Sequence, residues 1–165
     1  FAYVRENNLT EKGHFAAKIF ADEIVTGEIF ASDFVEKLDE YQIMLILACL
    51  VYEPRETNKF AHGYKTELLK DLQKLLLHHE YLAKERKFYF LPEMTTIIYP
   101  IYNGKSFFDL LEVTNLLEGD LIRFFAQIKD RIGQIRKATT NYKVANKMVN
   151  CQGIIDRALS GIYLI

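Results

Sequence analysis

Polar side chains recur at helical spacing in the last third of the chain, where they could bind an extended ligand. In an α-helix such positions share one face, here along roughly 20 Å of axis at about 1.5 Å per residue. Guanidinium, amide and carboxylate groups arranged in this way can hydrogen-bond a single strand of nucleic acid. The same pattern is also typical of the solvated face of a core helix. The residues are Arg123, Gln127, Asp130, Gln134 and Lys137.

Apolar residues occupy the opposite face of the same predicted helix. They follow one another at intervals of four, three, four and three positions, which is the spacing of a single buried stripe. The sequence therefore predicts a helix over residues 117–138 that packs on a core with one side and presents its polar residues on the other. The stripe consists of Leu121, Phe125, Ile128, Ile132 and Ile135.

Charge is distributed unevenly along a chain whose net charge is only -1. Residues 1–56 contain five Lys or Arg against eleven Asp or Glu, whereas residues 121–147 contain seven Lys or Arg against one acid, Asp130. A polyanion would therefore meet the C-terminal third of the chain. The alternative is a solvated surface whose charges balance across the fold.

Patterns that support catalysis or cofactor binding are incomplete in this sequence. Gly104-Lys105-Ser106 resembles the end of a phosphate-binding loop, but that loop needs a glycine at position 99, which is tyrosine, and a strand before it. No Ser-His-Asp or Cys-His signature has a supporting context. The histidines have no metal-ligand spacing with each other or with the cysteines. We therefore expect no catalytic centre, metal or cofactor in this chain. The histidines are His14, His62, His78 and His79.

Cysteine usage and hydropathy indicate a reducing compartment. Cys49 lies inside the apolar run 43–52, as expected for a buried thiol, and Cys151 is the only other cysteine. That run is too short to span a bilayer, and no signal peptide is visible. We expect a cytoplasmic protein, or a nuclear one in a eukaryote, with no membrane partner. Because the sequence begins at Phe1 without a methionine, we also expect it to be a piece of a longer protein.

Helical periodicity and capping residues predict an all-α fold, a compact bundle of about seven to eight helices in one domain over residues 1–165. Thr10, Ser32, Asp39 and Ser106 are suited to cap helices. Pro100 should bend or end its helix, and Asn103-Gly104 should stop it. The residues most buried should be those of the third helix, including Ile43, Leu45, Ile46, Leu47 and Leu50. The expected helices are 11–30, a short one from 33, 40–52, 64–87, 93–102, 107–112, 117–138 and 144–163.

Four segments, in this order, resemble one protein family. They are Leu9-Thr10-Glu11-Lys12-Gly13, the apolar helix that ends in Glu53-Pro54-Arg55-Glu56, residues 117–123, and Ile162-Tyr163-Leu164. Together they resemble the C-terminal helical domain, often abbreviated DSHCT, of superkiller- and Mtr-type DExH-box RNA helicases. The resemblance covers nearly the whole chain, and residues 117–123 are its most specific part.

The resemblance implies an accessory domain of an ATP-driven helicase of superfamily two. Such helicases unwind RNA and often feed it to an RNA-degrading complex. They bind ATP and Mg²⁺ in two RecA-like domains, which this chain lacks, so the chain alone should not be an enzyme. The helical domain packs across the RecA-like domains and helps to close a channel. Its partners would be these domains of the same chain and single-stranded RNA.

In this family one helix, called the ratchet helix, contacts the bases of the translocating strand, and by position it corresponds to residues 117–138. Gln127 and Asp130 stand where family members often have Arg and Glu, so Gln127 keeps hydrogen bonding but loses the cation. Arg123, Arg131 and Gln134 could supply part of the missing contact. The resemblance thus assigns the nucleic-acid interface to Arg123, Gln127, Asp130, Arg131 and Gln134.

Two other functions are compatible with these residues. One is a stand-alone helical interaction or regulatory domain, whose basic third binds an acidic partner protein. The other is an accessory domain of a DNA helicase, because a face that stacks bases and follows the backbone does not by itself distinguish RNA from DNA. A phosphate-binding loop and a DExH motif encoded upstream of Phe1 would favour the RNA helicase.

Overall fold

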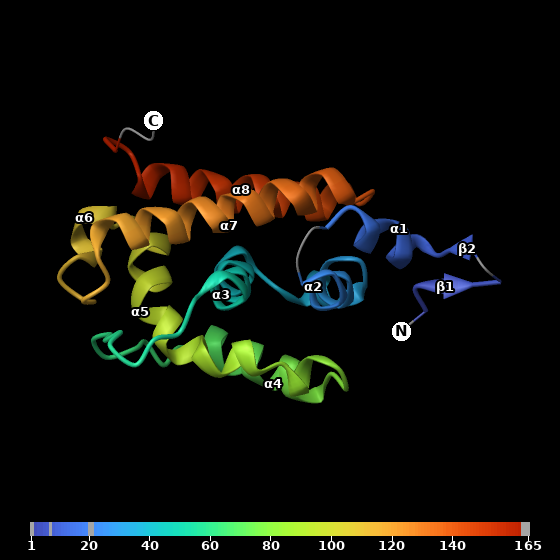
Figure 1. The fold of residues 1–165 in the computed structure, drawn as a ribbon, viewed down its shortest axis with the longest axis horizontal. Coiled ribbons are helices and arrows are strands. Elements are labelled where there is room, and N and C mark those ends of the chain that lie inside the picture. Colours follow the sequence, from blue (N-terminus) through green and yellow to red (C-terminus); the bar gives the residue numbers. More distant parts are fainter. Residues whose placement is uncertain (1, 7, 20–21, 163–165) are drawn as a thin grey trace.

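The central element of the fold is α3 (Glu40–Val51), which is apolar on every side after its first turn. The computed structural model describes residues 2–6, 8–19 and 22–162. Every residue of α3 from Tyr41 to Val51 is buried, and α4, α5, α7 and α8 all pack against it (Figure 1). The other α-helices are α1 (Glu11–Ala17), α2 (Glu23–Phe30), α4 (Glu67–His78), α5 (Leu91–Tyr102), α6 (Phe107–Leu110), α7 (Glu118–Ala138) and α8 (Tyr142–Ala158).

The caps predicted for α3 and its neighbours are confirmed. The Asp39 side chain accepts the backbone N–H of Gln42, and the Gln42 side chain accepts that of Asp39, which completes a capping box. Thr10 caps α1 by accepting the N–H of Gly13. Ser32 caps a 3₁₀-helix, η1 (Asp33–Lys37), where the sequence predicted a short α-helix. Local hydrogen bonding therefore determines where these helices begin.

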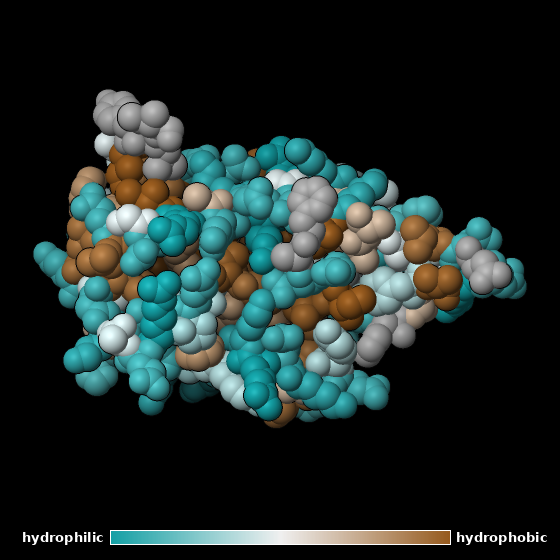
Figure 2. Space-filling view, in the orientation of Figure 1, coloured by the Kyte–Doolittle hydropathy of each residue, from teal (hydrophilic) through white to brown (hydrophobic). Residues whose placement is uncertain are grey.

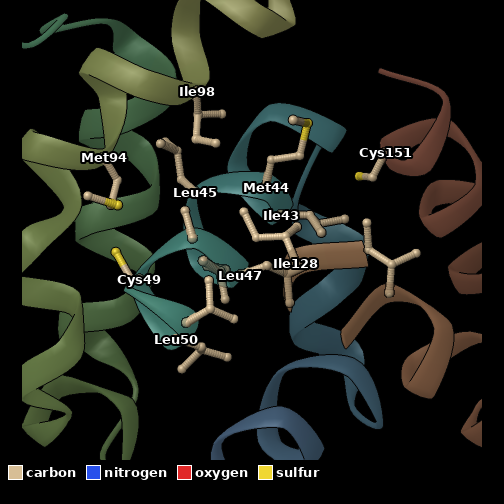
Figure 3. Packing of buried hydrophobic residues seen from close by; sticks show 14 of the residues in the cluster. Ile43, Met44, Leu45, Leu47, Cys49, Leu50, Met94, Ile98, Ile128 and Cys151 are labelled. Atoms are coloured by element: carbon tan, nitrogen blue, oxygen red, sulfur yellow. The ribbon is translucent and has the colours of Figure 1, made fainter. Parts of the chain in front are cut away.

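The core forms between α3 and the helices around it. Figure 3 shows α3 side chains directed toward Met94 and Ile98 of α5 on one side, and toward Ile128 of α7 and Cys151 of α8 on the other. The predicted core residues of α3 are at most 3% exposed, which confirms that expectation. They are Ile43, Leu45, Ile46, Leu47 and Leu50.

Two predicted helices are wrong in extent because tertiary contacts interrupt them. The helix expected over 11–30 is two helices, since Asp22 adopts a left-handed conformation (φ 52°) before α2. The helix expected over 64–87 ends at His79, whose Nδ1 accepts the N–H groups of Tyr81 and Leu82. The 3₁₀-helices η2 (Leu82–Lys84) and η3 (Arg86–Phe90) follow.

The remaining boundaries differ by a few residues. Pro100 does not end α5, because its carbonyl still accepts the N–H groups of Asn103 and Lys105 and closes the last turn. Asn103 and Gly104 (φ 90°) then stop the helix, as predicted. Ser106 caps α6, which is shorter than the expected 107–112, and α8 ends at Ala158 rather than at 163. Tyr163 and Leu164 of the predicted terminal motif lie outside the described residues.

The all-α prediction is confirmed, with one addition that periodicity did not indicate. Within the described residues there are eight α-helices and one small antiparallel hairpin of β1 (Val4–Arg5) and β2 (Asn8–Leu9). The hairpin projects beyond α1 at one end of the molecule (Figure 1). No helix in the described ranges is long and apolar enough to cross a membrane. On the face seen in Figure 2, hydrophilic side chains predominate and apolar ones gather in separate patches.

Candidate nucleic-acid interface

The helix that carries the predicted interface, α7, lies beside α8 and over α3 (Figure 1). Its apolar stripe is buried, and its polar residues are therefore on the outward side, as the spacing predicted. Phe124 is also buried and packs edge-on against Phe125, with ring centroids 5.2 Å apart. Substitutions on the outward side consequently remove no core contact. The buried stripe is Leu121, Phe125, Ile128, Ile132 and Ile135.

Two adjoining hollows follow the polar side of α7. The first is lined by Arg123, Asp120 and Gln127 of α7, and the second by Gln127 and the residues one and two turns later. Both are bounded on the far side by the segment that follows α3, and Val51, Tyr52 and Glu53 line both. We call the two hollows together the α7 groove. Its α7 lining in the second hollow is Gln127, Asp130, Arg131 and Gln134.

Four of the predicted site residues lie along this groove with their polar groups near its opening. Arg123 is exposed, and its Nη2 lies 3.8 Å from Oδ1 of Asp120. Gln127 is half-buried, borders both hollows and makes no hydrogen bond to the described residues. Gln134 donates to Asp130 at 2.8 Å, which joins two neighbours one turn apart. The structure therefore brings Arg123, Gln127, Asp130 and Gln134 to one surface.

Arg131, the fifth predicted residue, is mainly engaged within the protein. Its Nη1 lies 2.8 Å from Oδ2 of Asp22, and Nζ of Lys87 lies 2.7 Å from the other oxygen of that carboxylate. Burial acts to raise the pKa of Asp22, but the hydrogen bonds and charges of Lys87 and Arg131 outweigh it and lower the pKa. Arg131 thus lines the second hollow as one member of an internal ion-pair cluster.

The basic C-terminal third is largely paired within the fold. Lys129 lies 2.7 Å from the carboxylate of Asp156, and Lys147 donates to the carbonyl groups of Val35 and Leu38. With Arg131 also paired, the excess of positive charge in residues 121–147 does not form a continuous open surface. The groove itself contains the carboxylates of Glu53, Asp120 and Asp130. The groove also contains Arg55, Lys87, Arg123 and Arg131, so its charge is mixed.

The family model for the DSHCT (NUC185) domain matches residues 6–160 of the chain. The chain belongs to the DSHCT family. This assignment confirms the resemblance inferred from the four sequence segments.

Curated relatives of this DSHCT domain include RNA helicases. The ATP-dependent RNA helicase mtr4 of Schizosaccharomyces pombe is 26% identical over 162 residues, which cover 88% of this chain and 14% of that protein. The mRNA transport homolog 4 of Caenorhabditis elegans is 22% identical, over 92% of this chain and 16% of that protein. The DExH-box ATP-dependent RNA helicase DExH10 of Arabidopsis thaliana is 25% identical, over 77% of this chain and 14% of that protein. The DSHCT chain thus spans about one seventh of the relatives' length.

Residues on the far wall of the groove were not predicted as site residues. Arg55 and Asn58 line the first hollow, and Lys87 lines the second. The sequence indicated only that Glu53-Pro54-Arg55 ends a helix, and no local signal places these residues opposite α7. Their position in the DSHCT domain depends on packing between segments about 40 to 70 residues apart.

No alternative chemical centre is formed by the DSHCT residues that the structure describes. They contain no group of three His, Cys, Asp or Glu side chains that could hold a metal ion. His79 is turned inward, with Nε2 3.4 Å from Glu28, whereas His78 is exposed, as expected for adjacent helical residues. Burial raises the pKa of the Cys49 thiol, and it raises that of Cys151 to about 12. Neither thiol is a ready nucleophile.

Proposed function

We propose that residues 1–165 are the C-terminal helical domain of an ATP-dependent RNA helicase, and that α7 contacts the translocating single strand as a ratchet helix. One observation carries the proposal: α7 is anchored in the core by a full apolar stripe while its polar residues border an open groove. The family and the RNA helicases among the relatives support the helicase class. The helical domain supplies a surface, and turnover belongs to the rest of the helicase.

The groove residues are suited to contacts with bases more than with phosphates. The amide of Gln127 can donate and accept at once, as base edges require, and it has no hydrogen-bond partner among the residues that the structure describes. Asp130 and Gln134 present a paired acceptor and donor one turn further along. Arg123 is held only loosely by Asp120, so its guanidinium is able to stack on a base or bind a phosphate.

The other parts of the proposed helicase and its partner complex lie outside this chain. RecA-like domains of the same polypeptide would bind ATP and Mg²⁺ and would pack on this domain, and an RNA-degrading complex would receive the unwound strand. The proposal includes a cytoplasmic location for the helicase, or a nuclear one in a eukaryote. Accessory domains of DNA helicases and stand-alone interaction domains are the competing functions.

The test is a triple substitution on the groove face of α7 in a helicase that contains this chain. Replacing Arg123, Gln127 and Asp130 by Ala should slow strand displacement by at least about tenfold, because each lost base or phosphate contact weakens binding by about 1–3 kcal/mol. The melting temperature and basal ATPase should change little, since these side chains are outside the core.

A matched control removes the same side-chain types elsewhere. Asp71, Gln73 and Arg157 are exposed and border neither hollow, so their joint replacement by Ala should leave unwinding intact. Unchanged unwinding in the α7 variant would discard the ratchet assignment. A large fall in its melting temperature would show that this face is structural. Unwinding of DNA duplexes but not of RNA duplexes by the unmodified helicase would leave the DNA helicase as the better class.

A further inference from the structure

The first hollow of the α7 groove has a second wall that carries its own arginine. One wall is α7, with Arg123, and the other is the segment following α3, with Arg55. The two side chains are similarly exposed, 63% for Arg123 and 65% for Arg55. A ligand in this hollow therefore has a guanidinium available from each side.

Both arginines are loosely held. Nη2 of Arg55 is 3.8 Å from Glu53, and Nη2 of Arg123 is 3.8 Å from Asp120. Among the described residues, each arginine thus pairs only with an acid on its own segment. Exposed ion pairs at this distance contribute almost nothing to stability, and a ligand can displace them. Arg131 differs, because its 2.8 Å contact with Asp22 is largely buried. The first hollow thus holds the groove's two readily available guanidiniums.

The wall that carries Arg55 is fixed in place despite its irregular backbone. The side-chain amide of Asn115 accepts the N–H of Lys59 and donates to the carbonyl of Thr57, both at 2.7 Å. The hydroxyl of Thr114 donates to the carbonyl of Lys59, and the N–H of Ala61 donates to that of Val113. These bonds join the wall to the segment directly before α7, so the two walls of the hollow are connected by the fold itself.

The floor between the two arginines is aromatic and apolar. Tyr52 and Phe124 line the hollow together with Val51 and Leu116, and Asn58 holds the Tyr52 hydroxyl at 3.0 Å. Aromatic side chains flanked by cations are the general arrangement that binds single strands, with bases packed inward and phosphates at the rims.

We propose that Arg55 and Arg123 contact the phosphodiester backbone of one RNA strand from opposite sides of the first hollow. Arg55 is thereby a nucleic-acid-binding residue, and Asn115 is the residue that positions its wall. The proposal rests on the proposed function and extends it from one helix to a two-walled site.

Binding titrations of the 165-residue chain with a fluorescent oligouridylate test the proposal. The net charge of -1 predicts weak binding, around 10⁻⁴–10⁻⁶ M, so measurements begin at low salt. Arg55→Ala and Arg123→Ala should each weaken binding about threefold to tenfold and lower the slope of log affinity against log salt by about 0.7. Arg55→Lys should restore the slope. Arg157→Ala, which removes an exposed arginine from α8, should change neither quantity.

Cross-linking provides a second measurement, which reports where the RNA lies in the complex. Cys49 and Cys151 are buried, so an exposed thiol introduced by Arg55→Cys can be labelled alone with a photoreactive group. Illumination should join position 55 to the oligouridylate, whereas the same label at Arg157→Cys should not. Native melting temperatures of the variants establish that the fold is retained.

The outcomes separate this inference from the proposed function. If Arg123→Ala weakens binding while Arg55→Ala behaves like Arg157→Ala and position 55 does not cross-link, the two-walled site is wrong and the ratchet face stands. If the unmodified chain does not bind RNA and the labelled Arg55→Cys chain does not cross-link to it, both proposals fail.

Discussion

Asp22 joins three distant parts of the molecule through a single carboxylate. It precedes α2 in a left-handed conformation that aspartate tolerates better than most residues. Its side chain does not cap α2 and instead binds Lys87 of η3 and Arg131 of α7. Lys87 also lies 3.5 Å from the carbonyl of Leu50 at the end of α3. The Asp22 carboxylate therefore connects η3 to α7 through Lys87 and Arg131, which both line the second hollow.

Replacing Asp22 by Asn should destabilise the domain in a pH-dependent manner. The folded pKa of Asp22 is lower than the unfolded value of about 3.9. Its stabilising effect is therefore complete above the unfolded pKa and is lost as the pH falls through the folded pKa. We expect Asp22→Asn to cost about 1–3 kcal/mol at pH 7. Urea unfolding of both proteins between pH 7 and about pH 3 measures the difference, which should shrink with acidity.

Glu67→Gln is the matched control, because Glu67 is exposed and forms only a 3.4 Å pair with Lys70. If the free energies of unfolding of the unmodified chain and of Asp22→Asn changed in parallel with pH, ionisation of Asp22 would not contribute to stability. Asp22 would then have only a conformational role.

Spacing within one helix predicted part of the candidate site. Arg123, Gln127 and Asp130 share the outward face of α7 because helical periodicity is local, and their contact with nucleic acid stays a prediction. The pairing of Arg131 with Asp22 joins residues 109 positions apart, and Arg55 faces Arg123 across a hollow. Such juxtapositions are set by packing, so no sequence pattern indicated them.

At the scale of elements, α3 should dominate stability. Truncating Leu47 to Ala should cost about 2–5 kcal/mol, because the side chain is fully buried and neighbouring helices cannot collapse into the space. Leu77→Ala on α4 removes the same atoms from a residue that is 72% exposed and should cost less than about 0.5 kcal/mol. Chemical denaturation of both variants makes the comparison. Similar values would mean that α3 is not the energetic centre.

Helix starts were predicted better than helix interruptions. Thr10, Ser32 and Asp39 cap the elements expected of them, because a cap depends on residues three positions away. The breaks at Asp22 and His79 were missed. Asp22 pairs with Lys87 and Arg131 of other elements, and His79 bonds Tyr81 and Leu82 through Nδ1 while its Nε2 lies 3.4 Å from Glu28 of α2. Local chemistry determines a helix start, whereas the tertiary environment can end a helix at any favourable position.

At the scale of the whole molecule, the chain alone should hydrolyse no ATP. Gly104-Lys105-Ser106 lies in the turn between α5 and α6, after a helix rather than a strand, and position 99 is a half-buried tyrosine. Phosphate release by the purified chain, with and without RNA, should equal that of a mock preparation. RNA-stimulated release that survives further purification would contradict this expectation.

The position of α3 also constrains how the molecule can form during synthesis. The ribosome completes this apolar helix about a hundred residues before the end of α8, one of the helices that cover it. At about 5–20 residues per second, α3 waits roughly 5–20 s for its last neighbour. For that period its ten-residue apolar stretch is a surface on which chaperones, or other nascent chains, can act.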